Sequence, residues 1–191
     1  MLEMANYDKT YRQVDFSTEM LAGKEFDECQ FINCLFTGCD LSETEFLNCS
    51  FEDCTMMMLK LNGTGMKEVR MKGCKLTGFD FSLCNDFLFQ VDFISCQLDY
   101  ALFTGKKMRK TRFSGCSIIQ ADFSECDLTE AVFDDCVLTG TTFYRTLLEK
   151  ADFRTATDFS FDPDENRLKK ARFSLEGLPG LLQKYNILIE S

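Results

Sequence analysis

The chain has 191 residues, of which 21 are basic and 31 acidic, and its formal net charge is −10. It contains eleven cysteines but no histidine, which excludes Ser–His and Cys–His catalytic pairs, histidine general bases and most zinc sites. Without these groups, we expect a protein that is not an enzyme. The acidic balance disfavours nucleic acid as the main partner and suits a solvated surface or a basic partner.

The N-terminal segment, residues 1–15, is expected to cap the first repeat, with Tyr7, Tyr11 and Val14 covering its open end. Residues 1–10 lack the basic-then-apolar pattern of a secretory signal. No apolar run approaches the roughly 18 residues that a membrane helix needs. We therefore expect a cytoplasmic protein.

Large apolar residues recur every five positions through a first repeat block, residues 16–86. A period of five fits neither the 3.6 of an amphipathic helix nor the 2 of a half-buried strand. It indicates an internal repeat. The centres of this block are Phe16, Leu21, Phe26, Phe31, Phe36, Leu41, Phe46, Phe51, Met56, Leu61, Met66, Met71, Leu76 and Phe81.

The repeat breaks after Phe81, and a shift of two residues restores it at Leu88 in a second block, residues 87–157. The break predicts either a bulge or small loop at one corner, or a kink between two sub-domains. At least one of Phe87 and Phe89 is expected outside the core. The centres of this block are Leu88, Phe93, Leu98, Phe103, Met108, Phe113, Ile118, Phe123, Leu128, Phe133, Leu138, Phe143, Leu148 and Phe153.

Ten of the eleven cysteines lie two positions before a repeat centre, and Cys84 lies in the register break. Buried free cysteine behaves as a small hydrophobic residue, and spacings of five produce no C-x-x-C zinc pattern. We expect reduced, buried thiols. No glycine motif suggests a nucleotide site, and we expect no metal or cofactor.

Residues 158–191 are expected to form a closing coil and a C-terminal cap. Residues 162–166 predict an exposed turn, and Phe173 continues the spacing of the repeat. Pro179 suits the first turn of a helix, and residues 187–189 predict a short apolar strand. The expected cap residues are Leu178, Leu181, Leu182, Tyr185, Ile187 and Ile189.

Charge is distributed unevenly along the chain. Residues 1–55 hold twelve acidic and three basic residues, a net charge of −9. Two basic groups follow, at residues 67–75 and 106–112, and they predict a basic waist between acidic ends. Such a patch could hold an anion or an acidic partner, but a solvated mixed surface is the favoured interpretation. The groups comprise Lys67, Arg70, Lys72, Lys75, Lys106, Lys107, Arg109, Lys110 and Arg112.

The repeats resemble the pentapeptide-repeat family, whose pattern is A(D/N)LXX with Leu or Phe at the centre. The phrases at 121–124 (ADFS) and 151–154 (ADFR) match it closely. The resemblance implies an all-β solenoid, a right-handed quadrilateral parallel β-helix with one pentapeptide per side and a short C-terminal helix/strand cap. Residues 1–191 then form a single domain, in which Phe93, Phe113, Phe133 and Phe153 stack on one side and Phe103, Phe123 and Phe143 on the opposite side.

Within the family, the segment CxFxGCDLSxTEFxxCxF, residues 34–51, resembles the Qnr-type quinolone-resistance proteins. That resemblance implies a non-enzymatic DNA mimic that binds type II topoisomerase, either DNA gyrase or topoisomerase IV, and protects it from quinolones or modulates it. It also implies a homodimer through the C-terminal cap; a monomeric end cap is the alternative. The residues expected to face the topoisomerase are Glu25, Asp27, Glu28, Asp40, Glu43, Glu45, Glu52 and Asp53.

Two other functions remain open. A general protein-interaction scaffold with an unrelated partner is favoured by the basic waist and by the absence of the longer loops that protrude from Qnr-type proteins. An enzyme or anion-binding protein that uses the basic waist ranks behind both. Fold alone does not imply function.

Overall fold

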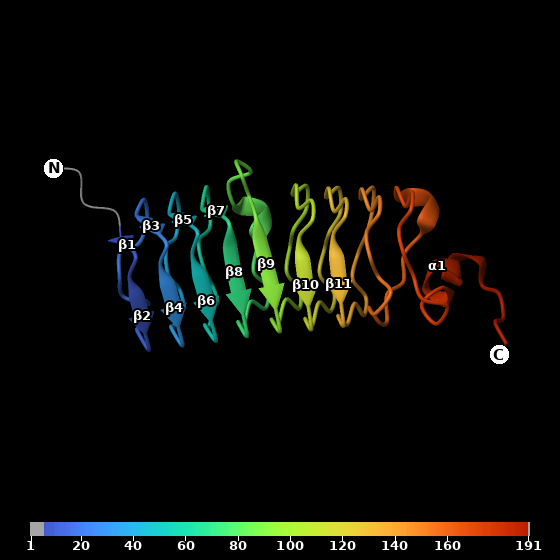
Figure 1. Cartoon of the computed structure of the whole chain (residues 1–191), viewed down its shortest axis with the longest axis horizontal. Coiled ribbons are helices and arrows are strands. Elements are labelled where there is room, and N and C mark those ends of the chain that lie inside the picture. The colour runs from blue at the N-terminus through green and yellow to red at the C-terminus, as the bar shows by residue number, and fades with distance from the viewer. Residues whose placement is uncertain (1–5, 191) are drawn as a thin grey trace.

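The computed structural model describes residues 6–190 as an elongated stack of coils (Figure 1). Two parallel sheets run along the stack. The first sheet contains β1 (Asn6–Tyr7), β3 (Glu25–Asp27), β5 (Glu45–Leu47) and β7 (Gly65–Lys67), in that order. The second contains β2 (Thr10–Arg12), β4 (Gln30–Ile32), β6 (Ser50–Glu52), β8 (Val69–Lys72), β9 (Val91–Ile94), β10 (Arg112–Ser114) and β11 (Val132–Asp134).

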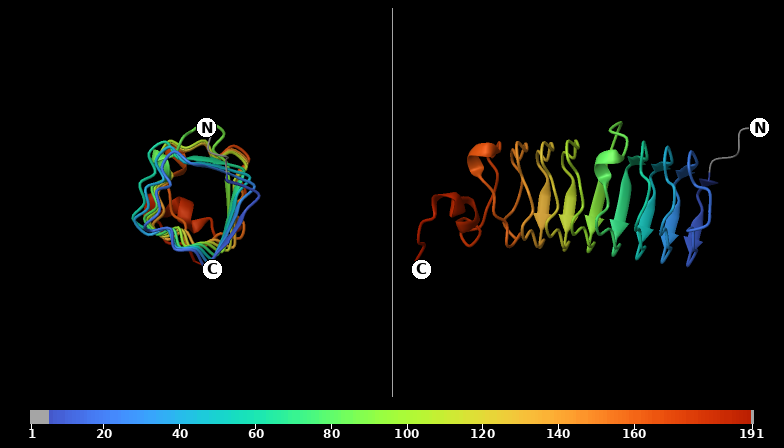
Figure 2. Two further views of the ribbon diagram at one scale, coloured as in Figure 1. Left: turned by 90° about the vertical axis from the view of Figure 1, so that its left-hand side faces the viewer. Right: turned by 180° about the vertical axis from the view of Figure 1, so that it is seen from behind.

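Each coil advances the chain by 20 residues in the first block, because Phe26 pairs with Phe46 and Phe31 with Phe51. Isolated parallel bridges, such as that between Leu35 and Thr55, form the other two sides. Seen along its axis, the chain traces a four-sided outline (Figure 2). The chain is thus a right-handed, four-sided parallel β-helix, as the family resemblance implies.

The strands are short because the chain turns a corner after each five-residue side. Many corner residues have a left-handed backbone; at one corner these are Asn33, Asp53 and Gly73 in successive coils. Asparagine, aspartate and glycine adopt that conformation at the least cost. The polar residues of the repeat therefore make the corners as well as the surface.

The core consists of the repeat centres, all of which are buried except Leu88. On one side, the rings of Phe93, Phe113 and Phe133 stack at centroid distances of 5.2 and 4.9 Å. On the opposite side, Phe103 and Phe123 stack at 4.6 Å. These contacts confirm the predicted alternation of the phenylalanines.

All eleven cysteines are buried and none forms a disulfide, which confirms the predicted thiols. Many donate to a carbonyl of the preceding coil; Cys39 Sγ lies 3.1 Å from the Phe16 oxygen. Thr44 makes the same contact through its hydroxyl, 2.8 Å from the Leu21 oxygen. The position two residues before each centre therefore favours a small side chain, and a weak donor there adds a bond between coils.

The register break is a projecting loop, which begins at η1 (Phe81–Leu83) and separates β8 from β9 (Figure 1). β8 pairs directly with β9, so the stack continues past the loop; Val69 faces Val91, two residues beyond the usual 20. Leu88 is 64% exposed, whereas Phe89 is only 7% exposed. The prediction that Leu88 is a repeat centre is wrong, because the loop rejoins the coil one residue later, at Phe89.

The prediction that Lys106 belongs to an exposed basic group is wrong. Its side chain is 2% exposed and occupies an inward position next to the loop. Its amine donates to the Cys84 carbonyl and to Asp86 Oδ1, the latter at 2.6 Å, and lies 5.3 Å from the centre of the Phe89 ring. A buried amine is tolerated only when its donors are satisfied in this way.

The C-terminal region contains η2 (Pro163–Glu165), α1 (Pro179–Leu182) and η3 (Gln183–Tyr185). Phe173 stacks on Phe153 at 5.3 Å, and Arg172 bridges Asp152, so the last coil closes as predicted. The predicted strand at 187–189 is wrong: these residues are irregular and exposed, and within residues 6–190 no backbone pairs with them. Residues 1–5 of the expected N-terminal cap lie outside the described residues.

Candidate functional site

The eight predicted acidic residues lie on or beside three sides of the first coils rather than on one face. Glu25 and Glu45 face each other across β3 and β5. Glu52 is on β6, and Asp40 bridges Lys60 on another side. Asp27 ends β3, while Glu28, Glu43 and Asp53 are corner residues with left-handed backbone. The carboxylates therefore wrap around the N-terminal end of the rod.

Three of the eight carboxylates are paired with a lysine of the following coil. Asp40 lies 3.3 Å from Lys60 Nζ and Glu52 lies 2.6 Å from Lys72 Nζ. Glu45 lies 2.8 Å from the amine of Lys67, which also sits over the ring of Phe87. These contacts reduce the negative potential that the three residues present to a partner.

The other five, Glu25, Asp27, Glu28, Glu43 and Asp53, make no ion pair among residues 6–190. The Tyr7 hydroxyl donates to Glu28 at 3.2 Å, and this bond raises the pKa of Tyr7. Because no cation neutralises them within the described residues, these five carboxylates are the strongest anionic positions of the predicted set.

Glycines in the next coil make room for two of these carboxylates. Glu43 lies over Gly63 and Asp53 over Gly73, where a Cβ atom would overlap the carboxylate. Both glycines also have positive φ, of 73° and 63°, which a larger residue adopts only with strain. The coil above thus allows the two acidic side chains to lie flat along the rod axis.

The two basic groups form no continuous patch. Lys67 and Lys72 are paired as above, and Arg109 pairs with Asp127 at 3.2 Å. Asp92 lies between Arg70 and Arg112 in the second sheet. The structure thus agrees with the mixed surface that the sequence favoured.

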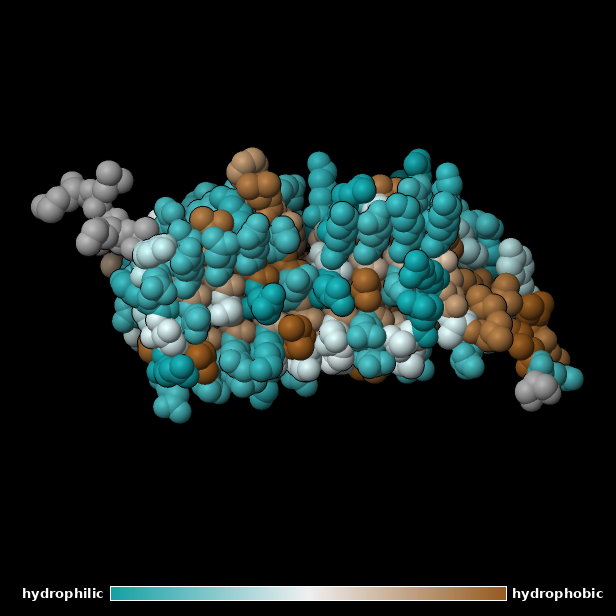
Figure 3. All heavy atoms as spheres, in the orientation of Figure 1, coloured by the Kyte–Doolittle hydropathy of each residue, from teal (hydrophilic) through white to brown (hydrophobic). Residues whose placement is uncertain are grey.

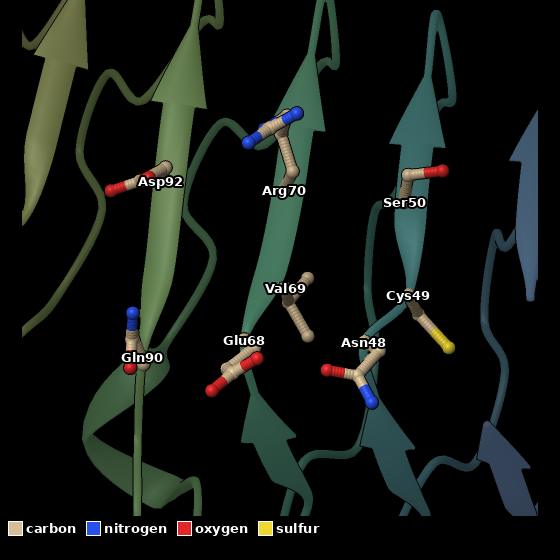
Figure 4. A pocket seen from close by; sticks show the side chains of 8 residues that line it. All are labelled: Asn48, Cys49, Ser50, Glu68, Val69, Arg70, Gln90 and Asp92. Atoms are coloured by element: carbon tan, nitrogen blue, oxygen red, sulfur yellow. The ribbon is translucent and has the colours of Figure 1, made fainter. Parts of the chain in front are cut away.

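A polar groove of about 330 Å³ lies across β6, β8 and β9, beside the register shift (Figure 4). Glu68, Arg70, Gln90 and Asp92 line it, and their side chains are arranged around the groove rather than buried in it. The two acidic side chains flank a single cationic one. This mixture of signs does not select an anion.

An apolar tip is the main feature that sequence reasoning left without a role. Phe87 and Leu88 are 65% and 64% exposed, and an apolar projection rises from the middle of the rod (Figure 3). Lys106 fixes the loop from inside. The register break in the sequence indicated a loop at this place. Which apolar residues the loop would expose depended on which of two neighbouring residues turned inward.

The C-terminal end exposes a second apolar area (Figure 3). Four of the six predicted cap residues are exposed, whereas Leu181 and Leu182 are half-buried, with Leu181 packed against the core. Leu188 is 93% exposed and lies in the same segment. The exposed residues are Leu175, Leu178, Tyr185, Ile187, Leu188 and Ile189.

Residues 6–190 bring no three metal-ligating side chains together. Burial raises the pKa of the Cys84 thiol to about 12, and that of Cys126 likewise. Protonated, buried thiols are poor nucleophiles. In the same part of the chain, no helix is long and apolar enough to cross a membrane.

Comparison with known proteins agrees with this geometry. A family model described as "Pentapeptide repeat region" matches residues 24–103 and 44–123, and one described as "Pentapeptide repeats (8 copies)" matches residues 116–154. No curated protein matches the sequence.

Among solved structures, the chain is similar to a trypsin-treated form of QnrB1, a plasmid-mediated fluoroquinolone resistance protein. The identity is 18%, the coverage is 97% of this chain and 99% of that one, and the TM-score is 0.52. It also matches HetL, a pentapeptide repeat protein of the cyanobacterium Nostoc sp. strain PCC 7120, at 15% identity over 90% of this chain and 87% of that one, with a TM-score of 0.38. At 18% identity, the likeness to QnrB1 establishes the fold alone.

Proposed function

Because this chain belongs to the pentapeptide-repeat family, we propose that it is a non-enzymatic, DNA-mimicking protein that binds type II topoisomerase in the cytoplasm. Binding to DNA gyrase or topoisomerase IV protects the enzyme from quinolones or modulates its activity. The observation that carries the proposal is the set of five carboxylates at the N-terminal end of a rigid rod that make no ion pair within the described residues. The fold that it shares with QnrB1 supports it.

The physical basis is a match between ordered charges. DNA presents about one negative charge per 1.7 Å of helix axis, held on a stiff cylinder. The β-helix holds its carboxylates on coils that repeat at about 4.7–4.9 Å, so they need little ordering on binding. A topoisomerase surface that binds phosphates can then meet Asp27, Glu28 and Asp53 as substitutes.

The first experiment is a gyrase supercoiling assay with this protein titrated in, with and without a fluoroquinolone. Restored supercoiling in the presence of drug identifies a protector, and inhibition without drug identifies a modulator. No effect in either arm at micromolar protein contradicts the proposal.

Two matched variants test the site. One changes the unpaired Asp27, Glu28 and Glu43 to their amides; the other changes the paired Asp40, Glu45 and Glu52 in the same way. Both remove three negative charges, but we expect the first to weaken topoisomerase binding at least tenfold more than the second. Equal effects would refute the assignment of the site to unpaired carboxylates.

We also propose that the C-terminal apolar area joins two copies in a homodimer. Its exposed leucines and isoleucines lie on one end of the rod, where a two-fold contact buries the same surface on both copies. Sedimentation of the wild type is expected to give a dimer, and Leu188→Glu a monomer. Met20→Glu, which alters a residue 85% exposed at the other end, is the control. A monomeric wild type overturns the dimer.

A general interaction scaffold is the second candidate, and the apolar tip at Phe87 and Leu88 favours it, since exposed apolar side chains do not imitate phosphates and commonly mark protein interaction sites. The Phe87→Ser, Leu88→Ser double variant separates the two. If the double variant no longer binds an unrelated partner but still binds topoisomerase, the scaffold is supported. If it still binds both, the result argues against the scaffold.

A further inference from the structure

One of the four sides of the rod carries almost no charge. Isolated parallel bridges run along it from Leu35 to Val137 and hold six successive coils in register. Across these coils, Lys75 and Asp99 are the only charged residues that point outward on this side. We call this side the low-charge face; it comprises residues 35–38, 55–58, 75–78, 97–100, 117–120 and 137–140.

The neighbouring side is densely charged by comparison. Over the same coils, the strands of the second sheet carry Glu52, Arg70, Lys72, Asp92 and Arg112. The low-charge face instead exposes apolar side chains, among them Met57 at 41%, Met58 at 76%, Tyr100 at 56% and Val137 at 37%. Depletion of charge together with exposed methionine and tyrosine is typical of the centre of a protein interface.

The two charges on this face have opposite signs and unused bonding capacity. Lys75 makes no ion pair among residues 6–190. Asp99 Oδ1 accepts from the Ser117 hydroxyl at 2.6 Å and from the Ile119 N–H at 3.0 Å, and its Oδ2 has no partner in the described part of the chain. Lys75 pairs with Gln97, so the two charges lie on adjacent coils at the middle of the face.

The order of residues along the face is self-complementary. A two-fold axis that lies in the plane of the face and crosses the rod between Lys75 and Gln97 reverses the order of the coils. It keeps the position of each residue within its pentad, so the first of the six coils faces the sixth coil of a second copy. Leu35 then faces Val137, and apolar side chains meet on both sides of the axis.

The same axis also brings Met57 opposite Ile119 in the second coil from each end. Tyr100 comes opposite Gly78, and within residues 6–190 no atom lies within 4 Å of the point that a Cβ would occupy there, so a ring has room. The smallest residues, Gly38 and Gly140, meet at the edges.

The charges fit the same arrangement. Lys75 of one copy faces Gln97 of the other, two residues before Asp99, so its long side chain reaches the free carboxylate oxygen. The pairing occurs twice, once on each side of the axis. The chain has a net charge of −10, so two copies repel one another unless they meet on a face without a surplus of acid. The projecting loop between Phe81 and Phe89 interrupts another side and leaves this face open.

We propose that the low-charge face is a self-association surface, on which a second copy of this chain packs face to face and antiparallel. The contact is isologous, because both copies use the same residues. It involves neither the N-terminal carboxylates nor the C-terminal apolar area, so it goes beyond the function and the end-to-end dimer proposed above.

The size of the face sets the strength of the contact. Six coils at about 4.8 Å and a side of about 16 Å give a flat contact of roughly 900 Å² when both copies are counted. Contacts below about 1,200 Å² are typical of weak, reversible complexes. At micromolar concentrations the face therefore contributes little, and the end contact alone decides whether the wild type and Leu188→Glu sediment as dimer or monomer.

The test is sedimentation equilibrium of full-length Leu188→Glu, in which the end contact is disrupted. We expect a monomer at low micromolar protein and a reversible dimer at concentrations on the order of 100 µM. A monomer throughout this range overturns the proposal. Because the end contact is removed, this result does not depend on whether the C-terminal dimer exists.

A charge swap in the same background tests the register. Leu35→Glu and Val137→Lys are each expected to weaken association at least about fivefold, because each buries an unpaired charge. The double variant is expected to recover most of the loss. Within one copy the two positions lie five coils apart, so the introduced charges meet only across the two-fold axis. A double variant weaker than either single variant contradicts the antiparallel register.

The matched control is Leu102→Glu, which alters a leucine 39% exposed on a different side, in a row that already contains Asp80 and Asp122. We expect it to leave association unchanged, and an effect as large as that of Leu35→Glu would refute the assignment of the face. Asp15 and Lys75 occupy the same row as Leu35, so the fold accepts charge there, which circular dichroism checks.

Discussion

At the scale of single residues, the position two before each repeat centre decides how the coils are joined. Cysteine and threonine there donate to the preceding coil, and alanine fills the space without a bond. Lys106 is the exception, since its long side chain passes inward and ends at the loop. This lysine, which departs from the small-residue pattern, thus compensates for the two-residue insertion in the register.

Replacing Lys106 by methionine tests this role. Lys106→Met retains the apolar stem but leaves the Cys84 carbonyl without its donor, so we expect a loss of about 1–3 kcal/mol in the free energy of unfolding. Urea denaturation measures it, and limited proteolysis should show faster cleavage in the loop. Lys107→Met, at an exposed neighbour, is the control and should change stability by less than about 0.5 kcal/mol. Similar losses in both would disprove the anchoring role.

Asp152 makes stability depend on pH. Arg154 donates to both carboxylate oxygens, at 2.9 and 2.8 Å, and lowers the pKa of Asp152. Because the folded pKa lies below the unfolded value of about 3.9, the stabilisation is present above that pH and is lost as pH falls through the folded value. Asp152→Asn should cost about 1 kcal/mol at pH 7, by urea denaturation, and less at pH 3.

The control for this variant is Asp158→Asn, at an exposed residue that makes no ion pair among residues 6–190. It should change stability by less than about 0.5 kcal/mol at either pH. A cost for Asp152→Asn that is the same at pH 3 and pH 7 would show that the ion pair is not its source.

At the scale of elements, each structural unit depends on the coil beside it. The strands have two to four residues, too few to be stable alone, and are held by pairing with the next coil. Helix α1 (Pro179–Leu182) is a single turn without a side-chain cap, so it too depends on what it covers. Its position rests on the backbone of Phe159, which lies directly beneath Gly180.

Gly180→Ala tests how closely α1 packs against the backbone of Phe159. The added Cβ would overlap the Phe159 carbonyl oxygen, a backbone atom that cannot rotate away, so the helix must move. We expect a loss of about 1–3 kcal/mol and faster hydrogen exchange across residues 177–185. Glu176→Ala, an exposed change in the same segment, should leave the exchange unchanged. Protection in Gly180→Ala equal to the wild type would mean that the contact is not close.

At the scale of the whole molecule, the rod is a one-dimensional stack in which each coil contacts its neighbours. Aromatic columns run through it, and ion pairs such as Glu130 with Lys150 join residues one coil apart. The eight predicted carboxylates lie toward one end of the rod, and an exposed apolar surface lies at the other. Distant parts of the rod therefore influence one another only through the coils between them.

Double-mutant cycles test this independence. Phe113→Leu and Phe133→Leu alter rings that stack at 4.9 Å, and we expect a coupling energy of about 0.5–1.5 kcal/mol. Phe31→Leu and Phe133→Leu lie several coils apart and should add within about 0.5 kcal/mol. Urea denaturation of the singles and doubles provides the data. Strong coupling of the distant pair would require cooperativity beyond neighbouring coils.

The sequence by itself determined the architecture, because the five-residue period is local and repeats often enough to identify each inward residue. The pentads predicted the stacked phenylalanines and the buried thiols, and the register break located the projecting loop. These features depend only on which residue of a pentad points inward.

Only the tertiary structure decided features that depend on residues a coil apart. Whether Leu88 or Phe89 turned inward depended on Lys106 beneath the loop, and 187–189 formed no strand because no neighbouring backbone pairs with it. Likewise, Asp40, Glu45 and Glu52 were paired by lysines of the next coil, whereas the other five of the predicted carboxylates form no ion pair within residues 6–190. Such contacts join residues about 20 positions apart, so they follow from the stacking of coils and not from any local pattern.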